Sequence, residues 1–110
     1  MAGRKRKKRP KSRDGSEELM LAAAWYRREE WERLRAVAAD PEDLEDTYDK
    51  WLRNAQRLMV QMGGKGIRLV KVDVGADELC AWCRQQSVPV DSAARAGFAS
   101  EKALRQDQGR

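Results

Sequence analysis

The segment Ile67–Arg95 constrains the fold most, because there a β-like run interrupts a chain whose other apolar residues follow helical spacing. Ile67–Val74, with the sequence IRLVKVDV, is rich in β-branched residues and alternates over part of its length. This pattern predicts a strand over residues 67–74. Val70, Val72 and Val74 would then lie on one face of that strand.

The predicted strand finds no convincing partner elsewhere in the sequence. A lone strand leaves backbone N–H and C=O groups unpaired along both edges. Val88–Val90 could supply a few hydrogen bonds, but it is short and Pro89 has no N–H to donate. Pairing with the same strand of a second chain would satisfy these backbone groups better, so we predict a homodimer through strand 67–74.

Two long helices are predicted before the strand, over residues 16–39 and 41–62. The second has apolar residues at regular spacing from Leu44 to Met62, with Asp40 as its N-cap and Gly63 and Gly64 ending it. The first shows similar spacing from Met20 to Ala38. Their short connection at Asp40 predicts an antiparallel αα-hairpin.

Two shorter helices are predicted after the strand, over residues 77–86 and 92–105, with a frayed tail over 107–110. At 110 residues the chain has room for one modest core. We therefore predict one small α-rich domain over residues 16–106, mostly α with one short β-strand.

The charge is divided unevenly along the chain. Eight of the 23 basic residues precede Asp14, and the chain from Asp14 onward holds 15 basic and 18 acidic residues. Residues 1–15 hold almost nothing apolar, so we predict a disordered basic arm that contacts the phosphates of nucleic acid. Its cations are Arg4, Lys5, Arg6, Lys7, Lys8, Arg9, Lys11 and Arg13.

The order strand, helix, turn, helix over residues 67–105 resembles a ribbon-helix-helix DNA-binding unit. The resemblance rests on the V-K-V-D-V run of the strand, on Leu79 and Trp82-Cys83 in the first helix, and on Asp91 or Ser92 as cap of the second. It implies that strands from two chains form an antiparallel ribbon in the major groove. Side chains on one strand face would then meet base edges, and the polar candidates are Arg68, Lys71 and Asp73. Lys71 and Asp73 share a face of the strand, and Arg68 lies on the other.

No residue pattern points to catalysis. The chain has no histidine, and its carboxylates gather at predicted helix starts, where capping accounts for them. Cys80 and Cys83 form a CxxC pair, but two sulfurs leave a zinc site two ligands short. The glycines at positions 63–66 lack the strand-loop-helix order and the GK[ST] ending of a phosphate-binding loop. We expect no enzyme, no metal and no cofactor.

Taken together, these features predict a small nucleic-acid-associated accessory protein of bacterial type, DNA-binding and ribbon-helix-helix-like in character, that uses its arm on phosphates. The alternative is a protein–protein interaction module, an adaptor or inhibitor, with an acidic helical body. The sequence shows no apolar run long enough to span a membrane and no secretory leader. We therefore expect a cytoplasmic protein.

Overall fold

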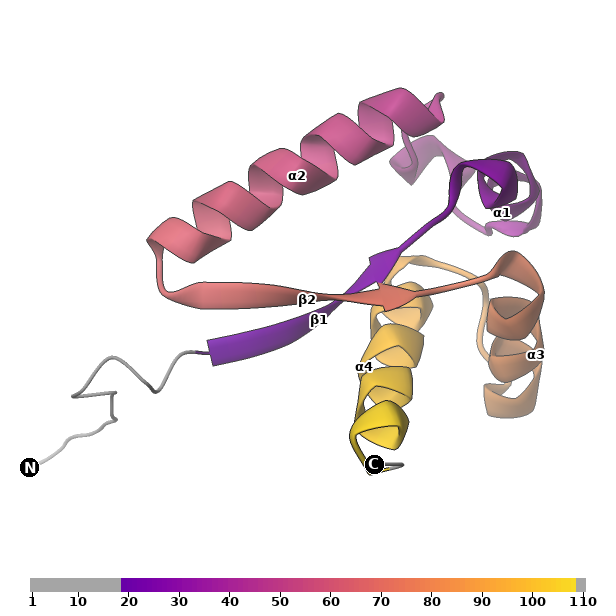
Figure 1. Cartoon of the computed structure of the whole chain (residues 1–110). Helices are drawn as coiled ribbons and strands as arrows, with labels where there is room; N and C mark the ends of the chain where they lie inside the picture. The colour runs from indigo at the N-terminus through magenta and orange to yellow at the C-terminus, as the bar shows by residue number, and fades with distance from the viewer. Residues whose placement is uncertain (1–18, 109–110) are drawn as a thin grey trace, which may run out of the picture.

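The structure, a computed structural model, describes residues 19–108, so the predicted arm over residues 1–15 lies outside the described residues (Figure 1). The described part is mostly helical, as predicted, but it contains two strands rather than one. Its elements in chain order are β1 (Leu19–Trp25), a 3₁₀ turn η1 (Arg28–Glu30), α1 (Trp31–Val37), a second 3₁₀ turn η2 (Pro41–Asp43), α2 (Tyr48–Gly64), β2 (Ile67–Asp73), α3 (Ala76–Gln86) and α4 (Ser92–Gln108).

The two strands form a parallel pair within one chain. Leu19 lies beside Ile67, and the register runs without a break to Trp25 beside Asp73. The predicted strand over 67–74 is therefore confirmed, but the expectation that it lacks a partner in its own chain is wrong. That pairing removes the reason for predicting a homodimer through residues 67–74, and an intermolecular contact there stays a prediction.

The predicted helix over 16–39 is wrong across residues 19–25, which form β1. Its alanines favour helix intrinsically, but pairing with β2 and packing between two helices override that preference. Small side chains suit this position: Ala22 faces a cavity lined from the other side by Ala103 of α4, and Ala23 faces one lined by Trp51 of α2. The predicted hairpin of two long helices thus loses its first arm, and the helix that remains is α1, with seven residues.

The second predicted helix, 41–62, begins later and ends later than expected. Residues 41–43 form η2, and α2 starts only after Thr47, whose side chain accepts a hydrogen bond from the Lys50 backbone N–H at 3.2 Å. Gly63 and Gly64 lie inside α2. The turn to β2 comes at Gly66, whose φ of +80° is a left-handed conformation that favours glycine.

Asp40, predicted as the N-cap of that second helix, instead joins the chain to α4. Its carboxylate accepts from Arg95 Nη1 at 2.7 Å and from the Ser92 backbone N–H at 3.0 Å. Both side chains of the ion pair are largely buried, with 7% of Arg95 and 13% of Asp40 exposed. The hydrogen bond from Arg95 lowers the pKa of Asp40. The predicted local cap at Asp91 is also present, since its Oδ1 accepts from the Ala94 backbone N–H at 2.9 Å. Asp40 adds a second contact at the start of α4 that local spacing cannot reveal.

The helices after β2 follow the prediction closely. α3 starts at Ala76, one residue before the expected position, and the Gly75 backbone N–H donates to Glu78 Oε2 at 2.8 Å. α4 continues to Gln108, so the predicted end at 105 is too early and residues 107 and 108 are helical rather than frayed. Residues 109–110 lie outside the described residues.

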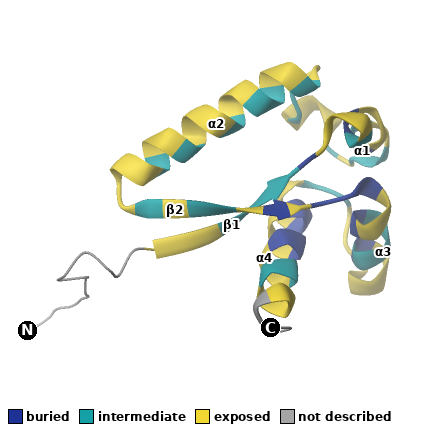
Figure 2. Cartoon of the chain, in the orientation of Figure 1, coloured by how far each residue is buried: buried dark blue, intermediate teal, exposed yellow. Residues whose placement is uncertain are grey.

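The core lies where β1 and β2 end, between α1, α3 and α4 (Figure 2). Its largest fully buried side chains are those of Trp31, Leu34, Leu79, Val72, Val74 and Cys83. Five aromatic rings gather on its α2 side, with ring centroids 5.1 to 6.1 Å apart: Trp25, Tyr26, Trp31, Tyr48 and Trp51. We call this region the packed end.

Candidate nucleic-acid interface

The segment from Lys50 to Val72 contains no acidic residue. It covers most of α2, the turn and nearly all of β2. Six cations fall within it: Lys50, Arg53, Arg57, Lys65, Arg68 and Lys71. Away from the packed end, this part of the molecule therefore presents positive charge without nearby carboxylates from its own sequence.

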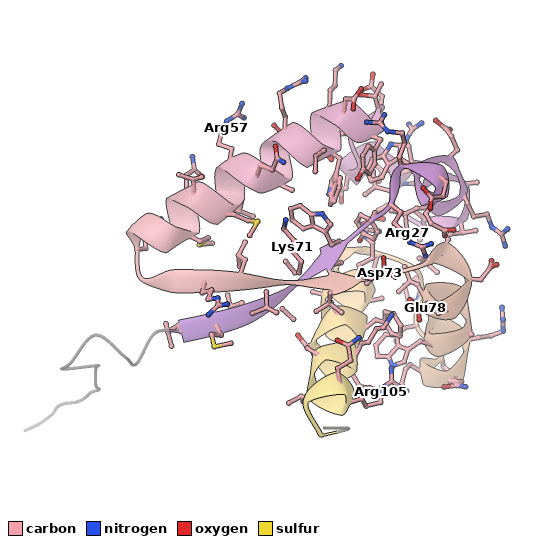
Figure 3. The ribbon with its side chains drawn as sticks, in the orientation of Figure 1. Arg27, Arg57, Lys71, Asp73, Glu78 and Arg105 are labelled. Carbon is pink, nitrogen blue, oxygen red and sulfur yellow. The ribbon has the colours of Figure 1, made fainter. Side chains whose placement is uncertain are left out.

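α2 presents two different faces. Trp51, Ala55 and Met59 lie toward the sheet and are half-buried, and no residue of α2 is fully buried. Arg53 and Arg57, four residues apart, lie together on the opposite face and are exposed. Figure 3 shows Arg57 directed away from the sheet. This helix therefore lies over the sheet as an outer layer, with a basic solvent face.

Neither Arg53 nor Arg57 forms an ion pair within the described residues, although carboxylates lie near both: the hydrogen bond from Arg28 and, to a smaller extent, the charge of Arg53 lower the pKa of Asp49. Arg57 Nη1 donates to the neutral side-chain oxygen of Asn54 at 3.1 Å. The nearest acidic position in α2, Asp49, is paired with Arg28 at 2.8 Å, and Lys50 is paired with Asp46 at 3.1 Å. Asp46 and Asp49 are thus paired with other cations, whereas Glu45 accepts from Asn54 Nδ2 at 2.9 Å and so lies beside the side chain that Arg57 contacts.

The strand register connects this region to the basic arm. Leu19 lies beside Ile67, so the chain before Leu19 joins the body where β2 begins, next to the α2–β2 turn. We call this region, with Arg53, Arg57, Lys65, Arg68 and Lys71, the basic end.

The arm cations predicted to bind nucleic acid, Arg4 to Arg13, lie outside the described residues. Arg68 and Lys71 are both exposed, but alternation along β2 puts them on opposite faces of the sheet. Lys71 lies on the α2 side, with its Nζ 4.6 Å from the centre of the Trp25 ring. The structure therefore does not bring Arg68 and Lys71 together on one strand face.

The pairing of β2 also differs from what the ribbon-helix-helix resemblance implies. That arrangement uses an antiparallel ribbon of strands from two chains. Here β2 pairs in parallel with β1 of the same chain, and α2 lies over the face that carries Lys71 (Figure 3). The side chains of that face are consequently covered in part by the chain's own helix.

A groove separates α2 from β2 along the edge of β2 that faces away from β1. Its volume is about 500 Å³. Met59 and Gly63 of α2 form one wall, and Gly66 together with five successive residues of β2, 67–71, forms the other. The groove thus lies within the acid-free segment.

At the packed end, by contrast, basic side chains lie next to acidic ones. Its surface cations are held in ion pairs that link separate elements, such as Arg27 with Asp73 at 3.0 Å and Arg33 with Asp77 at 2.6 Å. Lys102 of α4 joins Glu78 of α3 at 2.8 Å and also donates to the Asp73 backbone carbonyl at 2.6 Å. These charges stabilise contacts between elements and leave little net positive charge for a polyanion.

The CxxC pair lies on α3, with Cys80 half-buried, Cys83 buried and both thiols free. Burial raises the pKa of the Cys83 thiol, which disfavours the nucleophilic thiolate. Within residues 19–108, no three cysteine or carboxylate side chains come together as a group that could hold a metal ion.

Sequence reasoning missed the Arg53 and Arg57 pair as candidate binding residues. Their four-residue spacing, opposite to the apolar stripe of a helix and within a run free of acids, was the available signal. The comparison with known proteins adds nothing to the assignment: no family model, curated protein or solved structure matches the chain. None of the helices within residues 19–108 has the length and apolar character needed to cross a bilayer.

Proposed function

We propose that this protein is a nucleic-acid-associated accessory protein without enzymatic activity, acting in the cytoplasm. It contacts phosphates with two surfaces, the basic arm at Arg4–Arg13 and the exposed face of α2 at Arg53 and Arg57. The observation that carries the proposal is the strand register, which joins the arm to the body beside the acid-free segment. The arm is thus attached next to the α2–β2 turn, and Arg57 and Arg53 lie about two and three helical turns before that end of α2.

Electrostatic binding of this kind follows from the number of phosphates that a protein neutralises. Each neutralised phosphate of duplex DNA releases condensed counterions, so affinity falls with salt in proportion to the number of contacts. Contacts to phosphates position a protein but carry no sequence information directly. The proposed function is accordingly contact with nucleic acid of many sequences.

The alternative, a protein-interaction module using the acidic face at the start of α2, has less support. Asp46 and Asp49 on that face are paired with Lys50 and Arg28, and Glu45 accepts from the Asn54 side chain at 2.9 Å. Side chains already held within the chain are poorer candidates for binding a partner. This alternative becomes one outcome of the experiment below.

The test measures fluorescence anisotropy of a labelled DNA duplex against salt concentration. Replacing Arg53 and Arg57 together by alanine should reduce the slope of log affinity against log salt by about 2, because each lost phosphate contact removes about 0.9. Replacing all eight arm cations by glutamine in the full-length chain should reduce the slope by about 7 at most. The matched control, Arg28→Ala with Arg33→Ala, removes two exposed cations from the packed end and should leave the slope nearly unchanged.

Two results would contradict the proposal. If the arm replacement abolishes binding while the Arg53 and Arg57 replacement changes nothing, the arm acts as a generic phosphate contact and the body serves a protein partner. If the unaltered chain fails to bind DNA or RNA at about 50 mM salt, where electrostatic binding is strong, nucleic acid is not its partner.

A further inference from the structure

The edge of β2 that faces away from β1 is open to another strand. In the described part of the chain the sheet has two strands, so this edge of β2 has no strand beside it. The groove of about 500 Å³ runs along the edge, lined by five successive residues of β2, 67–71. A row of unpaired N–H and C=O groups beside a groove is the arrangement that binds extended peptides by strand addition.

The walls of this groove favour a peptide with apolar side chains on one face. Met59, Ile67 and Leu69 are half-buried and line it. Gly63 forms part of the α2 wall, and a Cβ placed on it would meet no atom within 4 Å. The groove therefore has unfilled space beside Gly63 that a side chain of a bound peptide could occupy.

The charge around the groove favours an acidic peptide. Lys71 lines the groove at one end, and Lys65 adjoins Gly66 at the other. Carboxylates are absent from the whole segment between Lys50 and Val72 that contains the groove. Lys71 Nζ lies 4.6 Å from the centre of the Trp25 ring, a contact that supplies no counter-charge and leaves Lys71 able to pair with a carboxylate.

Neither β1, nor the basic arm, nor β2 of a second copy matches this chemistry. β1 has no acidic residue and already pairs with β2 through its other edge. The arm is rich in cations, and the β2 strand of a second copy would bring Arg68 and Lys71 against the same charges. We propose that the free edge of β2 binds an extended, acidic segment of another protein, with apolar side chains on one face, as a third strand of the sheet.

This binding is independent of the proposed contact with nucleic acid, because it uses the groove and not the outer face of α2. The probe is a fluorescein-labelled peptide of alternating glutamate and valine, about eight residues long, which is a usual strand length. Binding is measured with the full-length chain whose eight arm cations are replaced by glutamine, so that the arm does not attract the peptide. A peptide with lysine in place of glutamate should bind at least about tenfold more weakly.

Gly63→Leu fills the groove and should weaken binding of the glutamate peptide by about tenfold or more. Gly64→Leu is the matched control: a Cβ at Gly64 also meets no atom within 4 Å, but Gly64 does not line the groove. Affinity for the control should stay within about twofold of that of the parent. Circular dichroism of both variants confirms that they keep the fold.

Strand addition has a second signature in the peptide backbone. Successive N–H groups of an added strand point alternately toward and away from the sheet. Methylation of one alternate set of peptide nitrogens should therefore abolish binding, while methylation of the other set leaves it nearly unchanged. A groove that merely holds side chains would show no such alternation.

The proposal is overturned if the glutamate peptide does not bind, or if the lysine peptide binds equally well. It is also overturned if Gly63→Leu and Gly64→Leu behave alike, or if the two methylation patterns have equal effects. Sedimentation of the chain without peptide tests whether a second copy of the chain occupies the groove instead. A dimer that Gly63→Leu dissociates would show that a second copy, and not an acidic peptide, fills the groove.

Discussion

At the packed end Trp31 and Leu79 are 2% and 0% exposed, whereas at the basic end Leu19 and Val60 are 68% and 76% exposed. Charge divides in the same way, since ion pairs such as Arg33 with Asp77 link elements at the packed end, while the segment between Lys50 and Val72 has no acidic residue at all. Figure 2 shows the buried residues gathered around the ends of the strands, with the start of β1 and much of α2 exposed. The comparison indicates that one end of this small chain supplies most of the stability and the other is available for contacts.

The largest expected difference between the two ends is in the cost of removing a side chain. Trp31→Ala should lower the free energy of unfolding by about 3–5 kcal/mol, because it leaves a cavity among Tyr26, Tyr48 and Trp51. Val60→Ala, on the exposed side of α2, should change it by less than about 0.5 kcal/mol. Urea denaturation measures both, and comparable losses for the two variants would refute the division into packed and basic ends.

The next effect concerns the buried ion pair. Asp40→Asn leaves the Arg95 guanidinium buried without its counter-charge, and should destabilise the fold by about 3 kcal/mol at neutral pH. Arg28→Ala, which breaks an exposed pair with Asp49, should cost no more than about 1 kcal/mol. Urea denaturation of both variants measures the two losses of unfolding free energy. Equal losses would contradict the expectation that the buried ion pair contributes more to stability than the exposed one.

The same pair predicts a dependence on pH. Because the pKa of Asp40 is lowered in the folded state, its stabilising contribution is present above the pKa of the unfolded chain and is lost as pH falls through the folded value. The unaltered chain should therefore lose stability on acidification more steeply than Asp40→Asn, and parallel curves would contradict this.

The smallest effect sharpens the comparison within the basic end. Gly66→Ala should destabilise by about 1 kcal/mol, because its φ of +80° is strained for any residue with a Cβ. Gly64→Ala, in the last turn of α2, should stabilise by about 0.5 kcal/mol, because it reduces the freedom of the unfolded chain and its Cβ meets nothing. Thermal unfolding should show a lower melting temperature for Gly66→Ala and a higher one for Gly64→Ala. An equal decrease for both variants would show that the positive φ of Gly66 is not what makes glycine necessary at the turn.

Local patterns in the sequence predicted α3, α4 and β2 to within a few residues. Val70 to Val74 alternate between two environments, and Gly75 with Glu78 marks the start of a helix, so each signal lies within the element that it describes. The basic arm and the acid-free segment are likewise properties of the sequence alone. Of the cations in the acid-free segment, sequence reasoning singled out Arg68 and Lys71 but not Arg53 and Arg57, and a binding role for any of them stays a prediction.

Tertiary structure alone decided the rest. LMLAAAW has no intrinsic preference for a strand, and it becomes β1 because β2, 48 residues later, offers it hydrogen bonds while α2 and α4 pack on its two sides. Asp40 could cap the helix that follows it, but its side chain makes no capping hydrogen bond there and instead accepts from Ser92 and Arg95 of α4. Local spacing determines which helices and strands a segment can form. Contacts between segments distant in the sequence determine which of these is present in the fold, because the hydrogen bonds and burial they supply outweigh small differences in local propensity.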